Sequence, residues 1–441
     1  MTRNLIRVMI LSLVSMGCVF HGSYTYAAEH DTEKKLDRII ADCAYQDFLR
    51  ASDGMNLVLH YQDQDLDAFG LLGEAKQMYE KLVVEFGFNR PSYPDPDRTI
   101  DIFVTNKKYL SRWIRQGVLS MSSERSHAPC FNAIEEADGY QMAIFLPENI
   151  KKTLANDPVS LRGTLIHELA HAVLFQYNKN VQGWLEHDYQ AGAVAQSFGK
   201  DWYAEGLARF FEIRVGSDAY FYKTEQISVL GGIKTTKRDG VNYLMDHPGR
   251  PFWQAGYDYA LFWEYLYEQY GMEKIEELSW RFSRIRPRDV VANAPEILSD
   301  VFEKDFSILI HDFAKSCASK NFDPDVADGL NDLAWDIMTS KSLVSSLIPW
   351  EQSFICVKDK RLLKSKSFNI DVAEGLMMST KILYDDGTME NHFVQLDRDQ
   401  PAWRFQLRGD LIDRVREIRF VMTNLDEGNT VRVSTHPRID E

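Results

Sequence analysis

The stretch that most constrains this chain is "GTLIHELAHAVLF", residues 163–175, which sets three polar side chains inside an apolar run. Asp157 and Pro158 precede it, and such a pair is typical of an N-cap and the first turn of a helix. On a helix, residues four apart lie on one face, so His167 and His171 would point in the same direction. The sequence therefore predicts a helix that carries a polar face into an apolar interior.

The polar trio of this helix has the residue types of a metal site. Imidazole nitrogens suit zinc, and a carboxylate beside the ion, here Glu168, can take a proton from water. The alternative is a helix whose polar groups simply face solvent. The residues around the trio are apolar: Leu165, Ile166, Leu169, Ala170, Val173 and Leu174. Because a charged carboxylate is costly in such surroundings unless it is paired or bound to metal, we favour the zinc site.

A catalytic zinc needs a third protein ligand. The pattern HExxHxxGxxH, which supplies a third histidine nearby, is absent because Leu174 and Tyr177 occupy its glycine and histidine positions. Two donors remain downstream, Glu205 in "DWYAEGLARFFE" and His187 in "LEHDYQ". Glu205 is favoured because its segment is typical of an apolar helix, and the small residues beside the carboxylate allow close packing against the first helix.

With both segments, "IHELAHAVLFQ" and "WYAEGLARFFE", the chain resembles the gluzincin metallopeptidases of the peptidase MA-like superfamily. The resemblance covers roughly residues 95–320. It implies His167, His171 and Glu205 as zinc ligands, and Glu168 as the general base of peptide hydrolysis. One departure is that 33 residues separate His171 from Glu205, more than in the thermolysin-like and aminopeptidase-N-like branches. The additional residues predict a surface loop near the cleft.

The resemblance also implies a side chain that stabilises the oxyanion and a strand that binds the substrate. Tyr257 in "AGYDYA" is the predicted oxyanion donor, with Tyr259 and His247 as alternatives. The strand "YQMAIFLP", residues 140–147, resembles the edge strand along which these enzymes hold an extended peptide. No GxMEN-type motif, which holds a free amine in aminopeptidases, lies near it. This favours an endopeptidase.

Hydrophobic periodicity indicates the elements on either side of this site. Before it, we expect a helix over 67–86 and strands over 99–105 and 140–146. After it, apolar residues recur at helical spacing from about residue 200 to about 320. From about Ser365, short alternating segments separated by turn residues are typical of an antiparallel sandwich.

We therefore predict an α+β protein with a zincin-like catalytic domain, made of a small α/β layer and a helical lobe, followed by an antiparallel β-sandwich. The expected divisions are a signal peptide over 1–27, an N-terminal region with the zincin subdomain over 28–200, the helical lobe over 201–345 and the sandwich over 365–441. The sandwich could bind a target surface, a glycan or a partner, or only stabilise the catalytic part. The sequence does not choose among these roles.

The first residues have the pattern of a secretory signal. Two arginines precede an apolar run that ends near Phe20, and small residues follow, so cleavage is expected near Ala27 or Ala28. This predicts a secreted or periplasmic protein. The alternative is a lipoprotein with a lipidated Cys18, but the residues before Cys18 fit that pattern less well. No later segment is apolar enough to span a membrane.

Charge and cysteine content exclude several classes of protein. The formal net charge of −15 opposes phosphate backbones, so nucleic acid is not an expected partner. Four cysteines follow the signal without a CxxC pair, which excludes a zinc ribbon: Cys43, Cys130, Cys317 and Cys356. Two disulfides and buried free thiols both remain open.

The predicted function is a secreted zinc metallopeptidase acting on peptide or protein substrates. Two alternatives share its zinc site. One is a secreted or surface binding protein that keeps a zincin scaffold without turnover, and the other is a metal-dependent hydrolase of non-peptide substrates.

Overall fold

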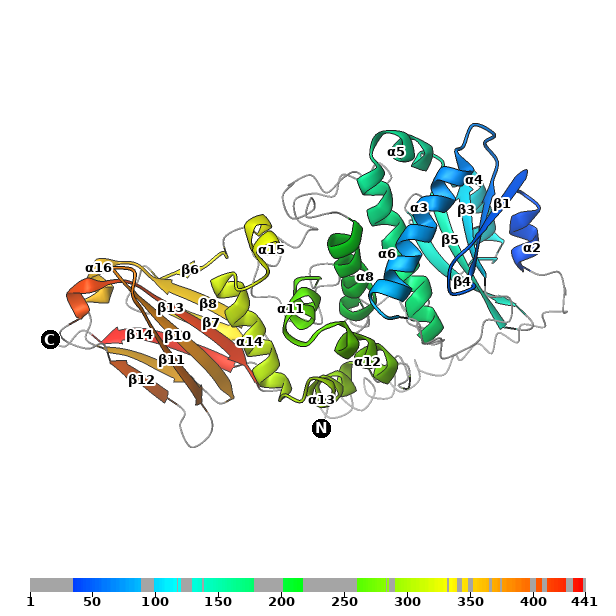
Figure 1. Ribbon diagram of the computed structural model, residues 1–441. Helices are drawn as coiled ribbons and strands as arrows, with labels where there is room; N and C mark the ends of the chain where they lie inside the picture. The colour runs from blue at the N-terminus through cyan, green and yellow to red at the C-terminus, as the bar shows by residue number, and fades with distance from the viewer. Residues whose placement is uncertain are drawn as a thin grey trace, which may run out of the picture.

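The computed structural model describes residues 35–88, 99–116, 118–119, 129–136, 139–177, 201–216, 260–282, 284, 290–330, 333–338, 343–347, 352–364, 367–372, 375–396, 402–406, 411–425 and 431–438. In Figure 1, a sheet with its helices lies at one end of the molecule, further helices lie in the middle, and two more sheets lie at the other end. This mixture of helices and sheets confirms the α+β class in its general form.

The N-terminal sheet has the strand order β1-β2-β3-β5-β4. Its strands are β1 (Tyr45–Arg50), β2 (Asn56–Tyr61), β3 (Thr99–Thr105), β4 (Cys130–Glu136) and β5 (Gly139–Pro147). The three central strands are parallel, and the two outer strands pair antiparallel to them. The predicted strands 99–105 and 140–146 are confirmed as β3 and β5.

Residues 140–147 resemble a substrate-binding edge strand in sequence, but they do not lie at an edge of the sheet. β5 lies between β3 and β4, and the strands at the two edges of the sheet are β1 and β4. The pairing runs from Cys130 opposite Phe145 to Glu136 opposite Gly139. The segment "CFNAIEE" shows little hydrophobic alternation, so only its hydrogen bonding to β5 defines it as a strand.

Helices cover both faces of this sheet. On one face lie α3 (Ala68–Glu80), the π-helical turn η1 (Lys81–Glu85) and α6 (Pro158–Tyr177), and on the other lie α2 (Lys35–Ile40) and α4 (Lys107–Arg115). α5 (Ile150–Asn156) precedes α6. Ile102 and Ile144 pack in the core under α3 and α6, whereas Phe103 and Phe145 pack with Trp113 of α4. Burial on both faces explains the continuous apolar runs of these strands.

The predicted helix over 67–86 is confirmed by α3 and η1. Asp67 caps α3, since its side chain accepts a hydrogen bond from the backbone N–H of Gly70. Gly87 follows η1 with a φ of +78°, a conformation that glycine adopts without strain.

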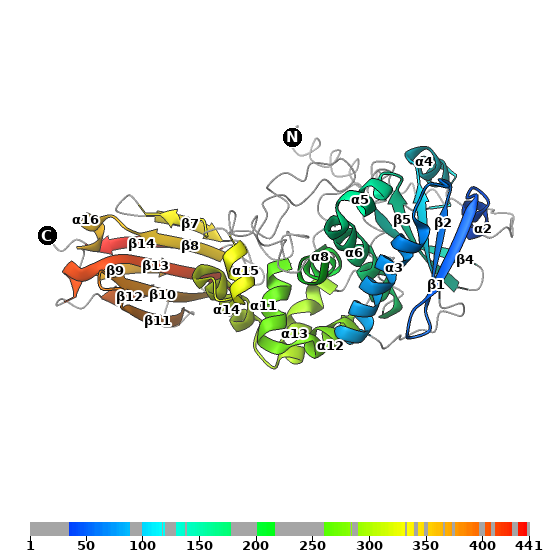
Figure 2. The same ribbon diagram turned by 45° about the horizontal axis from the view of Figure 1, so that its top comes forward.

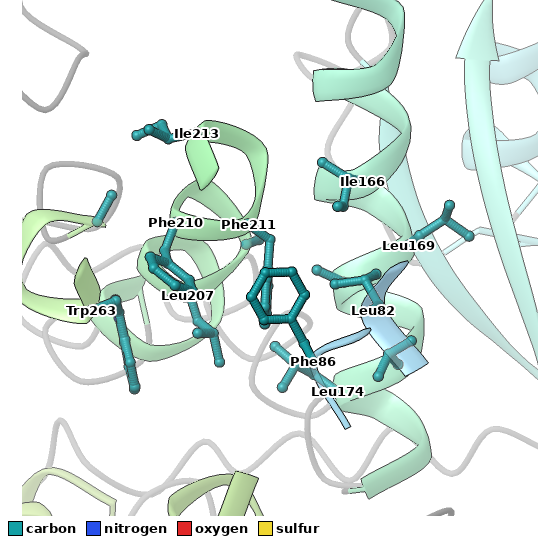
Figure 3. Close-up of a cluster of buried hydrophobic side chains, with 14 of the residues drawn as sticks. Leu82, Phe86, Ile166, Leu169, Leu174, Leu207, Phe210, Phe211, Ile213 and Trp263 are labelled. Atoms are coloured by element: carbon teal, nitrogen blue, oxygen red, sulfur yellow. The ribbon is translucent and has the colours of Figure 1, made fainter. Parts of the chain in front are cut away.

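The middle of the molecule is helical, as the spacing of apolar residues predicts. Its helices are α8 (Asp201–Gly216), α11 (Ala260–Tyr270), α12 (Met272–Phe282), α13 (Val290–Phe302), α14 (Phe306–Ser319) and α15 (Pro324–Gly329). α8 packs between α6 and α11 (Figure 2). Figure 3 shows the apolar side chains that fill the space between α6 and α8, where Phe86 meets Phe211 with ring centroids 5.6 Å apart.

Two sheets form the C-terminal part, with strand orders β11-β10-β13-β8-β6 and β12-β9-β14-β7. The strands are β6 (Asp336–Ile337), β7 (Leu343–Leu347), β8 (Gln352–Val357), β9 (Ser367–Val372), β10 (Leu376–Tyr384), β11 (Met389–Leu396), β12 (Ala402–Gln406), β13 (Val415–Asn424) and β14 (Val431–Arg438). A short helix, α16 (Lys360–Leu363), follows β8. Leu347 of one sheet shares a core with Ile355 and Phe420 of the other.

The sequence prediction of these sheets needs two corrections. The pairing is antiparallel except at one edge, where the two-residue strand β6 runs parallel to β8. The sheets also include β6, β7 and β8, which precede the predicted start at about Ser365. All six residues of β8 are buried, so this strand lacks the alternation that identifies its neighbours.

His311 joins α14 to the outer face of the first of these two sheets. Its Nδ1 lies 3.0 Å from Oγ1 of Thr423, and its Nε2 lies 2.8 Å from Oγ of Ser379. Burial, with a smaller contribution from the positive charge of Lys315, lowers the pKa of His311 to about 3. The imidazole is therefore neutral, and α14 is attached to the sheet through polar contacts inside an apolar interface.

Three further predictions concern the cysteines, membrane-spanning helices and the signal peptide. All four cysteines after the signal are free thiols. No helix among the described residues is long and apolar enough to cross a membrane. The predicted signal peptide, residues 1–27, lies outside the described residues.

We predict that His311 makes stability depend on pH. The pKa of His311 is about 3 in the folded protein and about 6.5 in the unfolded chain, so only the unfolded chain gains this proton between the two values. The free energy of unfolding should therefore fall as the pH decreases below about 6.5, by about 2 kcal/mol at about pH 5. Urea unfolding of wild type and His311→Gln near neutral pH and near pH 5 measures this. Equal pH dependence in both proteins contradicts the prediction.

Candidate metal centre

The helix that carries the polar trio is capped and buried as predicted. The Asp157 side chain accepts a hydrogen bond from the backbone N–H of Ser160 at 3.1 Å, which makes Asp157 the N-cap of α6. α6 then passes between the sheet, α3 and α8, so that every residue from Gly163 to Leu174 is buried. The interpretation in which the trio faces solvent is therefore wrong, because no side of this part of the helix is exposed.

Three ligand atoms converge between α6 and α8. Nε2 of His167 and Nε2 of His171 lie 3.2 Å apart. Oε2 of Glu205, which comes from the first turns of α8, lies 3.3 Å from the His167 nitrogen and 3.5 Å from the His171 nitrogen. The three side chains are 4–8% exposed, and they form a group that could hold a metal ion.

The donor set fits a tetrahedral ion. With metal–ligand bonds of about 2.0–2.1 Å, tetrahedral ligand atoms stand about 3.3 Å apart, which is close to the three observed separations. Oε2 of Glu205 is buried and makes no hydrogen bond with any described residue, although both imidazoles are near it. A buried carboxylate oxygen in this position is compensated by a cation at the centre of the triangle. The group therefore fits a divalent metal ion.

The charges of the cluster are strongly coupled. Burial alone would raise the pKa of Glu205, but the neighbouring His171 and His167 hold it well below its ordinary value. Burial would lower the pKa of His167, but its interactions with Glu205 and Glu212 raise it to about 10. Because a metal binds the neutral imidazole, protons compete with the metal for this side chain.

Behind His167 lies an ion pair that the sequence analysis missed. Oε2 of Glu212 lies 3.4 Å from Nδ1 of His167, on the side of the ring away from the other ligands. The other carboxylate oxygen of Glu212 forms an ion pair with Arg209, and both side chains are buried, 2% and 4% exposed. Metal-bound histidines usually donate their second N–H to such a carboxylate, which fixes the ring orientation. The signal in the sequence is that Arg209 and Glu212 are charged residues inside the same apolar helix as Glu205.

Of the other residues predicted for the site, one lies on α6 and the rest lie outside the described residues. Glu168 lies on α6 between the two histidines and is 6% exposed. The alternative ligand His187 and the predicted loop before α8 lie outside the described residues. Tyr257, with its alternatives Tyr259 and His247, also lies outside them, so the assignment of an oxyanion donor stays a prediction.

Comparison with known proteins adds no family to this description. No protein-family model matches the chain, and no curated protein is similar to it.

We predict that the three converging side chains bind one metal ion per chain. Purified wild type should contain close to one zinc, and Glu205→Ala should retain less than roughly a tenth of it, because two imidazoles alone hold zinc weakly. Elemental analysis measures the content, with the exposed Glu273→Ala as the matched control. Chelation should lower the Tm of wild type by about 5 °C or more and leave that of Glu205→Ala unchanged. Equal zinc in both variants contradicts the assignment.

We predict that Glu212 strengthens metal binding without contacting the metal. Glu212→Gln should keep a stoichiometry near one but bind zinc roughly 10–100-fold more weakly, because His167 loses the carboxylate that orients it. Competition with a chromophoric chelator measures the affinity. Glu273→Gln serves as the control, and unchanged affinity in Glu212→Gln means that the Glu212 contact is only structural.

Proposed function

We propose that this chain is a zinc-dependent metallopeptidase of the gluzincin kind, with a zincin-like catalytic domain, that is exported and cleaves peptide or protein substrates. The observation that carries the proposal is the buried convergence of His167, His171 and Glu205 at tetrahedral separations. Two imidazoles and one carboxylate form a donor set that suits zinc and leaves one coordination position for water or substrate. The sequence resemblance of both helices to gluzincins supports the same assignment.

Glu168, Glu212 and Tyr257 have different roles in the proposed hydrolysis. A zinc ion in this group, when bound, supplies a Lewis acid that lowers the pKa of water and polarises a substrate carbonyl. Glu168, on the same helix as both histidines, takes the proton of the attacking water and returns it to the departing amine. Glu212 holds His167 in the orientation that directs Nε2 into the site. Tyr257 is the proposed donor to the oxyanion.

The edge strand β4 is the proposed platform for the substrate. Among the described strands β4 has a neighbour on one side only, and its Phe131 ring lies 6.4 Å from the ring of His171. An extended peptide that pairs with this free edge would pass next to the zinc ligands. Since no amine-binding motif of the aminopeptidase type lies near residues 140–146, we propose internal cleavage of the peptide.

We predict that Glu168→Gln abolishes turnover and preserves metal binding. Loss of the general base should reduce cleavage of an unfolded protein by roughly 10²–10⁴-fold, because the glutamine amide cannot accept the proton. Cleavage of carboxymethylated casein is followed by gel electrophoresis and mass spectrometry, with zinc content measured on the same sample. A zinc-loaded wild type that cleaves no unfolded protein refutes the peptidase. A biological effect that survives Glu168→Gln indicates instead a binding protein that keeps the scaffold.

A further inference from the structure

A second site lies far along the molecule from the metal centre, between α14 and the outer face of the sheet β11-β10-β13. A pocket of about 460 Å³ opens there, a volume typical of small-ligand sites. Its lining residues come from α14, from the segment before β6, and from the three strands. None of the described residues that line it belongs to α6 or α8, so its function does not depend on the proposed peptidase.

Two cationic side chains stand side by side on the floor of the pocket. Lys381 of β10 is directly opposite Arg419 of β13 in the antiparallel register. Arg419 is held in place, because Nη2 lies 2.5 Å from Oε1 of Glu417 and the guanidinium stacks over the Trp335 ring at 5.1 Å. Lys381 makes no ion pair with any described residue. Glu417 compensates Arg419, so the ammonium of Lys381 is the cation in this pair that an anion bound beside Arg419 would compensate.

One further residue of the lining carries a positive charge. Lys315 of α14 reaches the pocket from the opposite wall, where its ammonium also bonds Asp312 at 2.7 Å. Among the described lining residues, none carries a carboxylate. The whole chain has a net charge of −15, so a cationic pocket is a local feature and does not follow from composition. The described lining residues therefore offer no carboxylate to an ammonium group, such as that of a free amino acid.

The uncharged lining residues suit a ring with hydroxyl groups. Phe393 of β11 is 58% exposed, and one part of its ring is supported by His311 at a centroid distance of 5.7 Å. Asn391, two residues earlier on the same strand, offers both a donor and an acceptor. Ser379 offers a hydroxyl that His311 holds in position at 2.8 Å. An exposed aromatic face beside short polar groups binds the apolar face and the hydroxyls of a sugar ring.

We propose that this pocket binds a carboxylated sugar, a uronic acid unit of a glycan. The carboxylate lies between Lys381 and Arg419, the ring lies against Phe393, and the hydroxyls bond Asn391 and Ser379. A charge-assisted hydrogen bond to each cation supplies most of the affinity, and the aromatic contact selects a ring over a simple anion.

Calorimetry on the full chain tests the proposal with trisaccharides of galacturonate, glucuronate and mannuronate as probes. The methyl-esterified trigalacturonate is the matched uncharged control, and a short peptide with a free C-terminal carboxylate is the second control. Lys381→Gln and Phe393→Ala should each weaken binding of the acidic trisaccharide roughly tenfold or more. The exposed Lys364→Gln near α16 should leave it unchanged. Thermal melts verify that all variants are folded.

Each contrary result overturns the proposal. It fails if none of the three uronates binds, or if the methyl ester binds as tightly as the acid. Binding that survives both Lys381→Gln and Phe393→Ala places the sugar elsewhere on the protein. A peptide carboxylate that binds as tightly as the uronates shows that the pocket recognises the carboxylate and not the sugar.

Discussion

The packing of α6 against α8 is the contact on which the metal centre depends. It brings two histidines and the carboxylates of Glu205 and Glu212 into an interior where an uncompensated charge costs several kcal/mol. Large apolar side chains hold the helices together, and Leu207 and Phe211 are almost fully buried. The ionisable groups in turn compensate one another, through the contacts of Glu205 with both imidazoles and through Arg209 with Glu212. The charge cluster and the apolar contact therefore depend on each other.

One continuous apolar core extends this support along the molecule. It runs from the N-terminal sheet through α6, α8 and α11 to α14, and it includes Phe354 and Val421 on the outer face of the C-terminal sheet. Ligands on packed helices are positioned more accurately than ligands on loops, which a metal site requires. The same core fixes α14 against the sheet, where the neutral His311 satisfies two hydroxyl groups.

The positions of the charged side chains determine the chemistry of the two sites more than the net charge of the chain does. An acidic chain buries Arg209 beside Glu212, the carboxylate behind His167, and gathers Lys315, Lys381 and Arg419 around one pocket. Both arrangements are local: the Arg209–Glu212 pair is in direct contact, and exposed charges further apart than about 8 Å are largely screened in physiological salt. Net charge therefore does not predict the chemistry of either site.

The sequence alone determined the elements whose signal is local: the capped helix α6, the helix α8, the strands β3 and β5, and the residues of the candidate metal site, His167, His171 and Glu205. Each follows from periodicity, capping or the spacing of residues within one element. Tertiary structure alone decided that β4 is an edge strand, that Glu212 supports His167, and that Lys381 stands opposite Arg419. Strand register and helix packing place these residues together from distant parts of the chain. No local pattern encodes such contacts, because their energy arises only when the elements meet.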